Sequence, residues 1–308
     1  MRTTDVTVAS GDVRLSGTLA EPDGPAGAVP LVLFLGGSGP LDRDTNMRGQ
    51  RLNAFPPFAA DLAARGIASF RYDKRGAGKS TGDFFSAGQT EFLADAVAAL
   101  DHFAEDPRFG RRFVLGHSEG TVQAARLSLE RIVDGLVLLA PFIEDAETSL
   151  MKQAAMLDEA LRNMPGVGGF LARLLSRPSG GPLVQQKKLI ELVKGSDEAV
   201  IRRGLQRIDA KSLREIMALD LAAIYAQVRT PALVIGGSKD IQCDPADVGR
   251  IVAAIGPAAT GVVVEDLTHV LRKDSGPPTF LSYLKLIRQP VEPEVLRLVG
   301  EWVAAKAS

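Results

Sequence analysis

Five residues near the middle of the chain, Gly116 to Gly120 with the sequence Gly-His-Ser-Glu-Gly, constrain the fold more than any other stretch. An apolar run, Phe113 to Leu115, precedes them and helix-compatible sequence, Thr121 to Arg131, follows, so they predict a sharp strand-to-helix turn. Such a turn crowds the backbone, and its two glycines relieve the crowding because they lack a Cβ atom. The turn would raise the Ser118 hydroxyl above a sheet and point helix N–H groups at an oxyanion formed there.

The composition excludes several classes of protein. Among 308 residues, 36 Lys plus Arg stand against 37 Asp plus Glu, which gives no reason to expect nucleic acid or a membrane surface as partner. The single cysteine, Cys243, cannot form an internal disulfide and is typical of a reducing compartment. The N-terminus has no apolar signal core, and the apolar runs are too short to span a bilayer. We expect a cytoplasmic protein with a small-molecule substrate, while the oligomeric state stays open, a homodimer included.

Strands and helices alternate over most of the chain, beginning with an antiparallel hairpin around Ser10 to Asp12. Continuous apolar runs indicate strands that are covered on both faces. The expected elements are a hairpin at 5–8 and 13–19, strands at 31–35, 67–72, 113–115, 136–140, from 231 and at 261–265, and helices at 58–65, 92–103, 121–131, 247–255 and 292–305. This alternation predicts an α/β fold with a mostly parallel, doubly wound sheet.

From about residue 142 to residue 219 the pattern changes to helices only, expected at 154–161, 170–175, 183–193, 198–208 and 213–219. We therefore expect a core domain at 1–141 and 220–308 and an inserted helical lid at 142–219, lying over the carboxyl edge of the sheet. The alternative is a helical insertion away from the site. The lid's apolar residues would suit an apolar acyl or alkyl group, or could form its own core: Met151, Met156, Leu157, Leu161, Met164, Phe170 and Leu174.

Two loops after predicted strands carry unusual sequences. Residues 36–44 contain three glycines within four positions, so their N–H groups can converge on an external oxygen. The expected donor is the Ser38 N–H, and the Gly37 N–H is the alternative. The other interpretation of this stretch is an ordinary turn. Residues 73–80 end in Gly-Lys-Ser, but a phosphate-binding loop needs glycine where Asp73 stands. We expect this second loop to hold the strand ends together through Asp73 and Arg75.

A serine hydroxyl needs a base to become nucleophilic, and the chain has only three histidines. His269 follows the last strand, at the sheet edge where Ser118 also emerges, and is the expected base. His117 should point the other way and serve packing or polar support, whereas His102 lies near the exposed end of a predicted helix.

The base in turn needs an acid that fixes its tautomer. Asp240 ends the strand before His269 at the same sheet edge, and the chain order Ser118, Asp240, His269 is the one found in hydrolases with a strand-to-helix serine turn. Asp244 and Asp266 are the rival acids.

Over nearly its whole length the chain resembles the α/β-hydrolase superfamily, and within it the bacterial serine esterases. The resemblance implies Ser118 as nucleophile, Asp240 as acid, His269 as base, and the Ser38 and Glu119 N–H groups as oxyanion donors. Four motifs in the expected order carry it: Gly37-Ser38-Gly39-Pro40 with Asp42-Arg43-Asp44, Asp73-Lys74-Arg75-Gly76 with Gly78 and Ser80, Gly116-His117-Ser118-Glu119-Gly120, and Thr268-His269-Val270-Leu271.

The implied activity is hydrolysis of carboxylic esters through an acyl-enzyme. A thioesterase, an amidase and a carbon–carbon bond hydrolase use the same triad, and a non-catalytic ligand-binding module is the alternative from another class. A dehalogenase is disfavoured because its nucleophile would be Asp at position 118. No metal or cofactor is expected from three separated histidines and one cysteine. Thr268 stands where relatives often have Asn, which leaves the hydrogen bonding there open.

Overall fold

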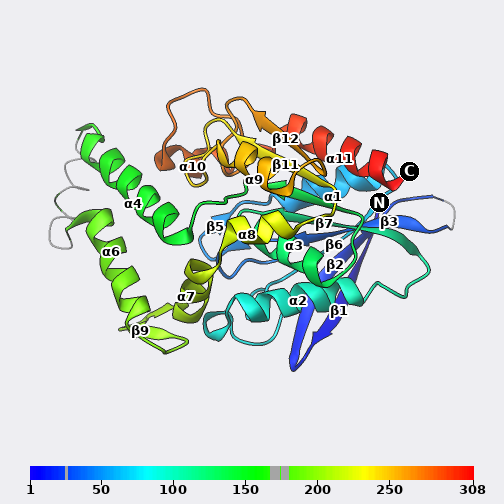
Figure 1. Cartoon of the computed structure of the whole chain (residues 1–308), viewed down its shortest axis with the longest axis horizontal. Helices are drawn as coiled ribbons and strands as arrows, with labels where there is room; N and C mark the ends of the chain where they lie inside the picture. The colour runs from blue at the N-terminus through cyan, green and yellow to red at the C-terminus, as the bar shows by residue number, and fades with distance from the viewer. Residues whose placement is uncertain (25–26, 167–173, 175–179) are drawn as a thin grey trace.

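The centre of the protein is an eight-stranded sheet in the order β1-β2-β6-β3-β7-β8-β11-β12 (Figure 1). The computed structural model describes residues 1–24, 27–166, 174 and 180–308. β1 and β2 form the expected antiparallel hairpin, β2 is antiparallel to β6, and from β6 onward neighbouring strands are parallel. The strands are β1 (Arg2–Ser10), β2 (Val13–Glu21), β3 (Val29–Leu35), β6 (Ala68–Tyr72), β7 (Phe109–His117), β8 (Gly135–Leu139), β11 (Ala232–Gly237) and β12 (Ala259–Val264).

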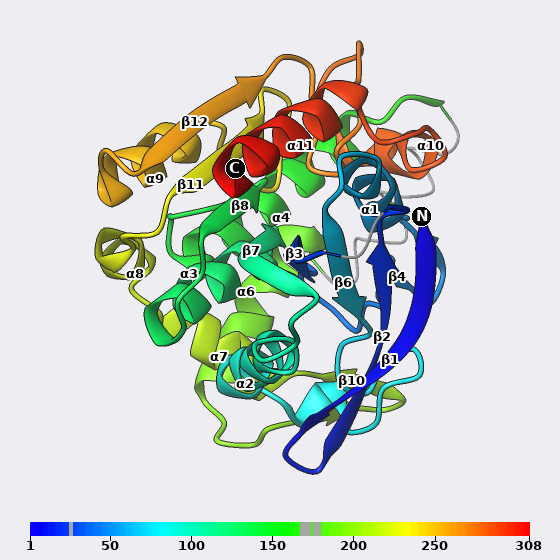
Figure 2. The same cartoon turned by 90° about the vertical axis from the view of Figure 1, so that its right-hand side faces the viewer.

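Helices cover both faces of this sheet, as the view in Figure 2 shows. One face carries α1 (Phe55–Ala64) and α11 (Pro293–Ala307), and the other carries α2 (Gln89–Asp101), α3 (Glu119–Glu130), α8 (Leu221–Gln227) and α9 (Asp247–Ile255). Neighbouring residues of β3 divide between the two layers, since Phe34 packs with α1 and Leu33 packs in the α2 and α3 layer. The doubly wound α/β architecture expected from the continuous apolar runs is confirmed.

Residues 142–219, between β8 and α8, are here called the insertion, and their described part lies beyond the strand ends at the left of Figure 1. The expected helix at 183–193 is confirmed, whereas the one at 170–175 lies outside the described residues apart from Leu174. Within the described part, the insertion consists of α4 (Ala146–Asn163), α6 (Gly181–Lys194), β9 (Ile201–Arg203), β10 (Gln206–Ile208) and α7 (Ala210–Ala218).

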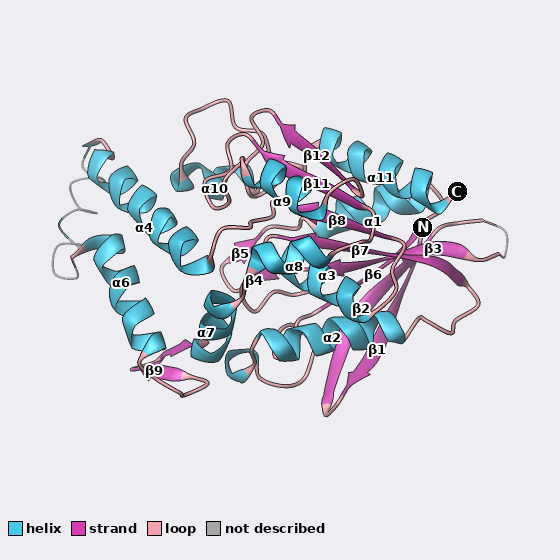
Figure 3. Ribbon diagram, in the orientation of Figure 1, coloured by secondary structure: helices cyan, strands magenta, loops and turns pink. Residues whose placement is uncertain are grey.

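The helix expected at 198–208 is wrong, because β9 and β10 form a short hairpin there (Figure 3). Gly204 adopts a φ of +59° in the turn, a conformation that glycine enters without steric cost. Ile201 pairs with Ile208, and both side chains are buried against Val193 of α6. Two buried ends joined by a glycine turn therefore outweigh the local helix preference, and the insertion is not all-helical.

Other differences concern the ends of elements and short elements in loops. α4 begins well before residue 154, because the Asp145 carboxylate accepts the Thr148 N–H at 2.8 Å and caps the helix. α8 was not predicted; it is anchored by the buried Tyr225, whose hydroxyl donates to Thr121 Oγ1 at 3.4 Å. The remaining unpredicted pieces are β4 (Asn46–Met47), β5 (Gln50–Arg51), η1 (Phe84–Ser86), η3 (Phe280–Ser282) and α10 (Tyr283–Leu286).

The loop at 73–80 has the structural role expected of it. Asp73 is buried and accepts hydrogen bonds from the backbone N–H and the guanidinium group of Arg43 and from the Lys79 N–H. Arg75 forms a bidentate ion pair with Asp95 of α2 at 2.7 Å. These contacts tie the glycine-rich loop after β3 to the end of β6 and to α2, and so fix that loop beside the end of β7.

Candidate active site

Ser118 stands alone between the last residue of β7 and the first residue of α3, with φ 54° and ψ −123°. Its N–H donates to the Leu139 carbonyl at 2.9 Å, which holds the turn against β8. A Cβ atom on Gly116 would collide with the Gly120 carbonyl, and one on Gly120 would collide with the Leu35 carbonyl. The tight turn predicted from the sequence is therefore present, and its positive φ stores about 1–3 kcal/mol of backbone strain at the serine.

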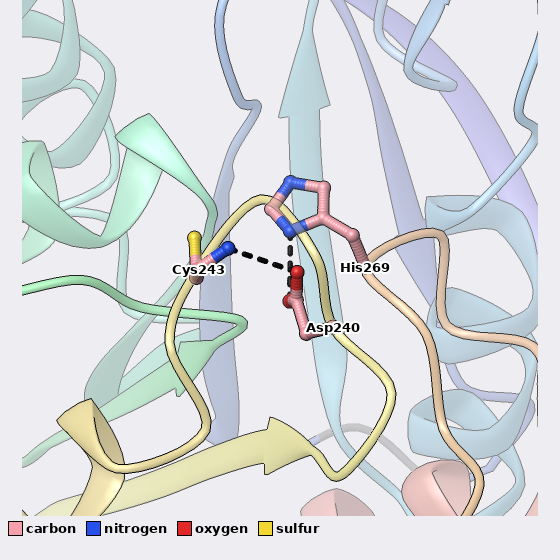
Figure 4. Close-up of side chains that lie close together, drawn as sticks. All are labelled: Asp240, Cys243 and His269. Carbon is pink, nitrogen blue, oxygen red and sulfur yellow. Dashed lines mark hydrogen bonds and ion pairs between the residues drawn. The ribbon is translucent and has the colours of Figure 1, made fainter. Parts of the chain in front are cut away.

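Two hydrogen bonds connect Ser118, His269 and Asp240. Ser118 Oγ lies 3.0 Å from His269 Nε2, and His269 Nδ1 lies 2.9 Å from Asp240 Oδ2. The other oxygen of Asp240 accepts the backbone N–H groups of Gln242 and Cys243 at 2.8 and 2.9 Å. Figure 4 shows the hydrogen bonds of Asp240 with Cys243 and with His269. A carboxylate at Nδ1 places the proton there, so the lone pair of Nε2 faces the serine hydroxyl, which donates to it. This geometry suits proton transfer from the serine to the histidine.

The two rival acids have other partners. The Asp244 carboxylate accepts the Ala246 N–H at 2.9 Å near the start of α9, and Asp266 pairs with Lys239 at 2.7 Å. In the described structure neither forms a hydrogen bond to His269, and Asp240 alone of the three does.

The loop of His269 has its own backbone support. Thr268 Oγ1 donates to the Arg272 carbonyl at 2.7 Å. This hydrogen bond is the one that the sequence left open for the threonine before His269. His117 is buried, and its Nε2 lies 3.0 Å from the His269 carbonyl, so it gives the polar support expected of it. The expectation that its ring points away from the site is wrong, because the centre of the ring lies 5.1 Å from that of the His269 ring. Burial and the neighbouring His269 lower the pKa of His117 from 6.5 to about 4, so the neutral ring donates this hydrogen bond. The third histidine, His102, is exposed at the end of α2.

The low pKa of His117 makes the protein less stable in mild acid. Between pH 6.5 and about 4 the unfolded chain binds a proton that the folded protein excludes, so stability falls as the pH falls through this window. Between pH 7.5 and pH 5 the free energy of unfolding should fall by about 2 kcal/mol because of His117. Urea unfolding of His117→Gln, which keeps an N–H donor but does not titrate, should show a correspondingly smaller loss between these pH values. An equal loss in both proteins would contradict this role.

The glycine-rich loop after β3 brings free N–H groups next to Ser118. A Cβ on Gly37 would lie 3.1 Å from Ser118 Cβ, so only glycine fits without displacing the serine. Among the described residues, the Ser38 N–H has no hydrogen-bond acceptor. Glu119 occupies the first position of α3, where a helix leaves its N–H groups unpaired. Two backbone donors thus flank the serine, and Ser38 Oγ donates to Glu119 Oε2 at 2.8 Å between them.

A cavity of about 210 Å³ opens at Ser118, between the sheet edge and the insertion. Its apolar lining comes from the segment after β8, from α4 and from α7: Phe142, Ala146, Leu150, Leu213 and Ile216. From the sequence, other apolar residues of the insertion were equally suited to an apolar substrate group and to the insertion's own core. Of those that the structure describes, none lines this cavity; Leu157 lines a neighbouring one of about 530 Å³, and Met156 is exposed.

Asp240, Cys243 and His269 place donor atoms within 4.8 Å of one another, a grouping that the sequence did not suggest (Figure 4). Burial, with Asp240 and Asp247 nearby, raises the pKa of the Cys243 thiol well above its ordinary value. A protonated thiol is a poor metal ligand, because metals bind the thiolate. Asp240 Oδ2 and His269 Nδ1 are hydrogen-bonded to each other, so this donor set does not suit a metal ion.

The family model described as "Serine aminopeptidase, S33" matches residues 48–275. The chain belongs to this family of α/β-hydrolases. A curated relative, Esterase EstD of Thermotoga maritima, is 25% identical over 297 residues, which cover 94% of this hydrolase and 65% of the relative. The chain thus spans somewhat less than two thirds of the length of the curated relative that it matches.

Solved structures of esterases share the fold of this hydrolase. Est1E from Butyrivibrio proteoclasticus, solved with ferulic acid bound, superimposes with a TM-score of 0.63 at 17% identity, covering 98% of both chains. A Pyrococcus furiosus esterase, Pf2001, gives a TM-score of 0.61 at 18% identity, covering 100% of this chain and 92% of the other. None of the helices in the described parts of the chain is both long and apolar enough to cross a bilayer.

Proposed function

We propose that this α/β-hydrolase cleaves carboxylic esters through an acyl-enzyme formed on Ser118. The observation that carries the proposal is the pair of hydrogen bonds from Asp240 through His269 to Ser118, at the mouth of a cavity. The similarity to Esterase EstD supports the ester as the reacting bond.

In this mechanism Ser118 Oγ attacks the ester carbonyl while His269 Nε2 takes its proton. The Ser38 and Glu119 N–H groups bind the oxyanion, with Gly37 as the alternative donor, and each contributes about 3 kcal/mol to transition-state stabilisation. His269 then protonates the leaving alcohol and later removes a proton from the water that releases the acid. The Asp240 carboxylate accepts from His269 Nδ1 and stabilises the imidazolium that forms in both steps.

We further propose that residues 142–219 act as a lid on a core formed by 1–141 and 220–308. α4 supplies Leu150 and α7 supplies Leu213 and Ile216 to the cavity that contains Ser118. These side chains exclude water from the reacting group, which strengthens every hydrogen bond to the oxyanion.

The size and lining of the cavity favour a short apolar acyl group. Its volume of about 210 Å³ lies below the roughly 300–1,000 Å³ of clefts that hold drug-sized ligands. We expect kcat/KM on p-nitrophenyl esters to be highest between acetate and hexanoate, because each buried methylene contributes about 0.8 kcal/mol. It should be about tenfold lower for decanoate, whose longer chain overfills the cavity and displaces its lining at a cost of about 1–3 kcal/mol.

Leu150 and Gln153 line both this cavity and the larger neighbouring one. Leu150→Ala should therefore shift the chain-length optimum toward longer esters. The matched control is Leu157→Ala, since of these two cavities Leu157 lines the larger one and not the one at Ser118. An unchanged optimum in Leu150→Ala, or an equal shift in both variants, would contradict the assignment of this cavity to the acyl group.

Amide cleavage at a peptide N-terminus is the second candidate, because the family model carries that description. An aminopeptidase needs a carboxylate that binds the substrate's ammonium group. Among the described residues lining the cavity, the only carboxylate is Glu119, which accepts from Ser38 and lies 3.8 Å from Lys74. We therefore expect p-nitrophenyl butyrate to be cleaved and aminoacyl p-nitroanilides to be cleaved far more slowly. Faster turnover of the anilides would reverse this choice.

A further inference from the structure

Lys74, in the loop after β6, directs its ammonium group at the back of the glycine-rich loop. Its Nζ donates to the Gly37 carbonyl at 2.5 Å and lies 3.8 Å from Glu119 Oε1. The Gly37 carbonyl and the Ser38 N–H are the two ends of one peptide group. In a planar trans peptide these two bonds point in opposite directions, so a donor that holds the carbonyl also sets the direction of the N–H.

The surroundings of Lys74 show that its position is fixed. Only 13% of its side chain is exposed, and Nζ lies 5.1 Å from the centre of the Phe92 ring and 5.8 Å from that of Phe84. Burial lowers the pKa of Lys74, while the carboxylates of Glu119 and Asp209 act in the opposite direction and favour the ammonium form. A buried ammonium group is costly unless it is paired and hydrogen-bonded, so this lysine differs from the mobile lysines of a protein surface.

The same ion pair reaches the second donor. Glu119, the residue whose N–H begins α3, accepts Ser38 Oγ with one carboxylate oxygen and faces Lys74 with the other. Gln89 Nε2 lies 3.4 Å from this second oxygen. Lys74 and Glu119 therefore connect the peptide of Ser38 to the start of α3, and hold the two N–H groups at a fixed separation.

We propose that Lys74 is a positioning residue for the oxyanion site: it orients and polarises the Gly37–Ser38 peptide so that the Ser38 N–H is aimed at the developing oxyanion. A positive charge at the carbonyl withdraws electron density from the amide and strengthens its N–H as a donor. This inference rests on the proposed serine hydrolase function and adds a residue that touches neither the substrate nor His269.

Lys74→Met tests the inference, because methionine keeps an apolar stem beside the stacked rings of Phe84 and Phe92 but cannot donate to the Gly37 carbonyl. Removing a whole oxyanion donor lowers kcat by about 10²–10³, so loosening one should lower it about 10- to 100-fold with KM changed less than about threefold. Lys74→Arg, which keeps charge and donors, should retain a higher kcat than Lys74→Met. The matched control is Lys79→Met in the same loop, whose side chain is 75% exposed and forms an ion pair with Asp5 at 3.7 Å.

A trifluoromethyl ketone with the preferred acyl chain gives a direct measure of the oxyanion site. Ser118 Oγ adds to its carbonyl carbon, the proton passes to His269, and the ketone oxygen becomes the oxyanion. The inhibition constant should rise in Lys74→Met by the factor that kcat/KM falls, and carbon-13 NMR of labelled ketone should show the adduct oxygen ionising at higher pH. An inhibition constant and an adduct ionisation equal to those of the wild type would overturn the role of Lys74. A rise in KM equal to the rise in the inhibition constant, together with a lower melting temperature, would also overturn it. A wild-type enzyme that neither hydrolyses esters nor binds the ketone would instead overturn the proposed function.

Discussion

Ser118→Ala is expected to lower kcat for p-nitrophenyl butyrate by about 10⁴ to 10⁶, the range seen when a nucleophile that acts with a base is removed. The hydroxyl is the group that His269 Nε2 faces at 3.0 Å, and no other hydroxyl forms a hydrogen bond to that nitrogen among the described residues. The fold should be retained, because alanine keeps the Cβ and the hydroxyl makes no other hydrogen bond that the structure describes. Steady-state kinetics of the wild type and Ser118→Ala measures the loss of kcat, and thermal melting of both proteins checks that the fold is retained.

The matched control for this substitution is Ser149→Ala. Ser149 lines the same cavity, but its hydroxyl donates to Glu144 at 3.4 Å and lies on α4. We expect kcat of this control to stay within about threefold of wild type, as for a residue outside the catalytic unit. If Ser118→Ala kept a tenth or more of wild-type activity, another residue would have to be the nucleophile.

Asp240→Asn is expected to lower kcat by about 10³ to 10⁴, because the substitution inverts the tautomer of His269. Asp240 Oδ1 accepts two backbone N–H groups, so the oxygen of an asparagine would stay there and its NH₂ group would face His269 Nδ1. Nδ1 would then have to accept, the ring proton would move to Nε2, and Nε2 could no longer take the proton of Ser118. The variant should keep its fold, since the two backbone hydrogen bonds are preserved.

Asp244→Asn is the control that separates the two acids. Its side chain accepts the Ala246 N–H near the start of α9, and an asparagine oxygen can do the same. Stopped-flow or steady-state assays should show Asp244→Asn within about threefold of wild type. A large loss in this control together with normal activity in Asp240→Asn would move the acid to position 244.

Most of the fold could be predicted, because buried parallel strands leave a strong sequence signal. Leu31 to Leu35 must be apolar throughout, since alternate residues pack against helices on opposite faces. The serine turn was equally predictable, because Gly116 and Gly120 meet backbone carbonyls that admit no Cβ. His269 and Asp240 could be predicted as partners of Ser118 because they follow β12 and β11 at one sheet edge, and the chain has only three histidines.

The insertion could not be predicted as well, because its structure depends on contacts distant in sequence. Ile201 and Ile208 form a hairpin since both are buried against α6, whereas their spacing alone also fits a helix. The residues that line the cavity depend in the same way on how α4 and α7 rest against the core. Lys74 was likewise missed as a contact of the glycine-rich loop after β3, although its motif was noted, because a backbone carbonyl partner leaves no sequence signal.

The most direct test of the proposed acyl-enzyme mechanism is to find the acyl group on the protein. The enzyme is mixed with excess p-nitrophenyl butyrate, quenched in acid within milliseconds, and measured by intact-mass and peptide mass spectrometry. We expect one butyryl group per chain, located on the peptide that contains Ser118 and absent from Ser118→Ala. Turnover of the ester with no acyl adduct, or with the adduct on Cys243 or another residue, would contradict it.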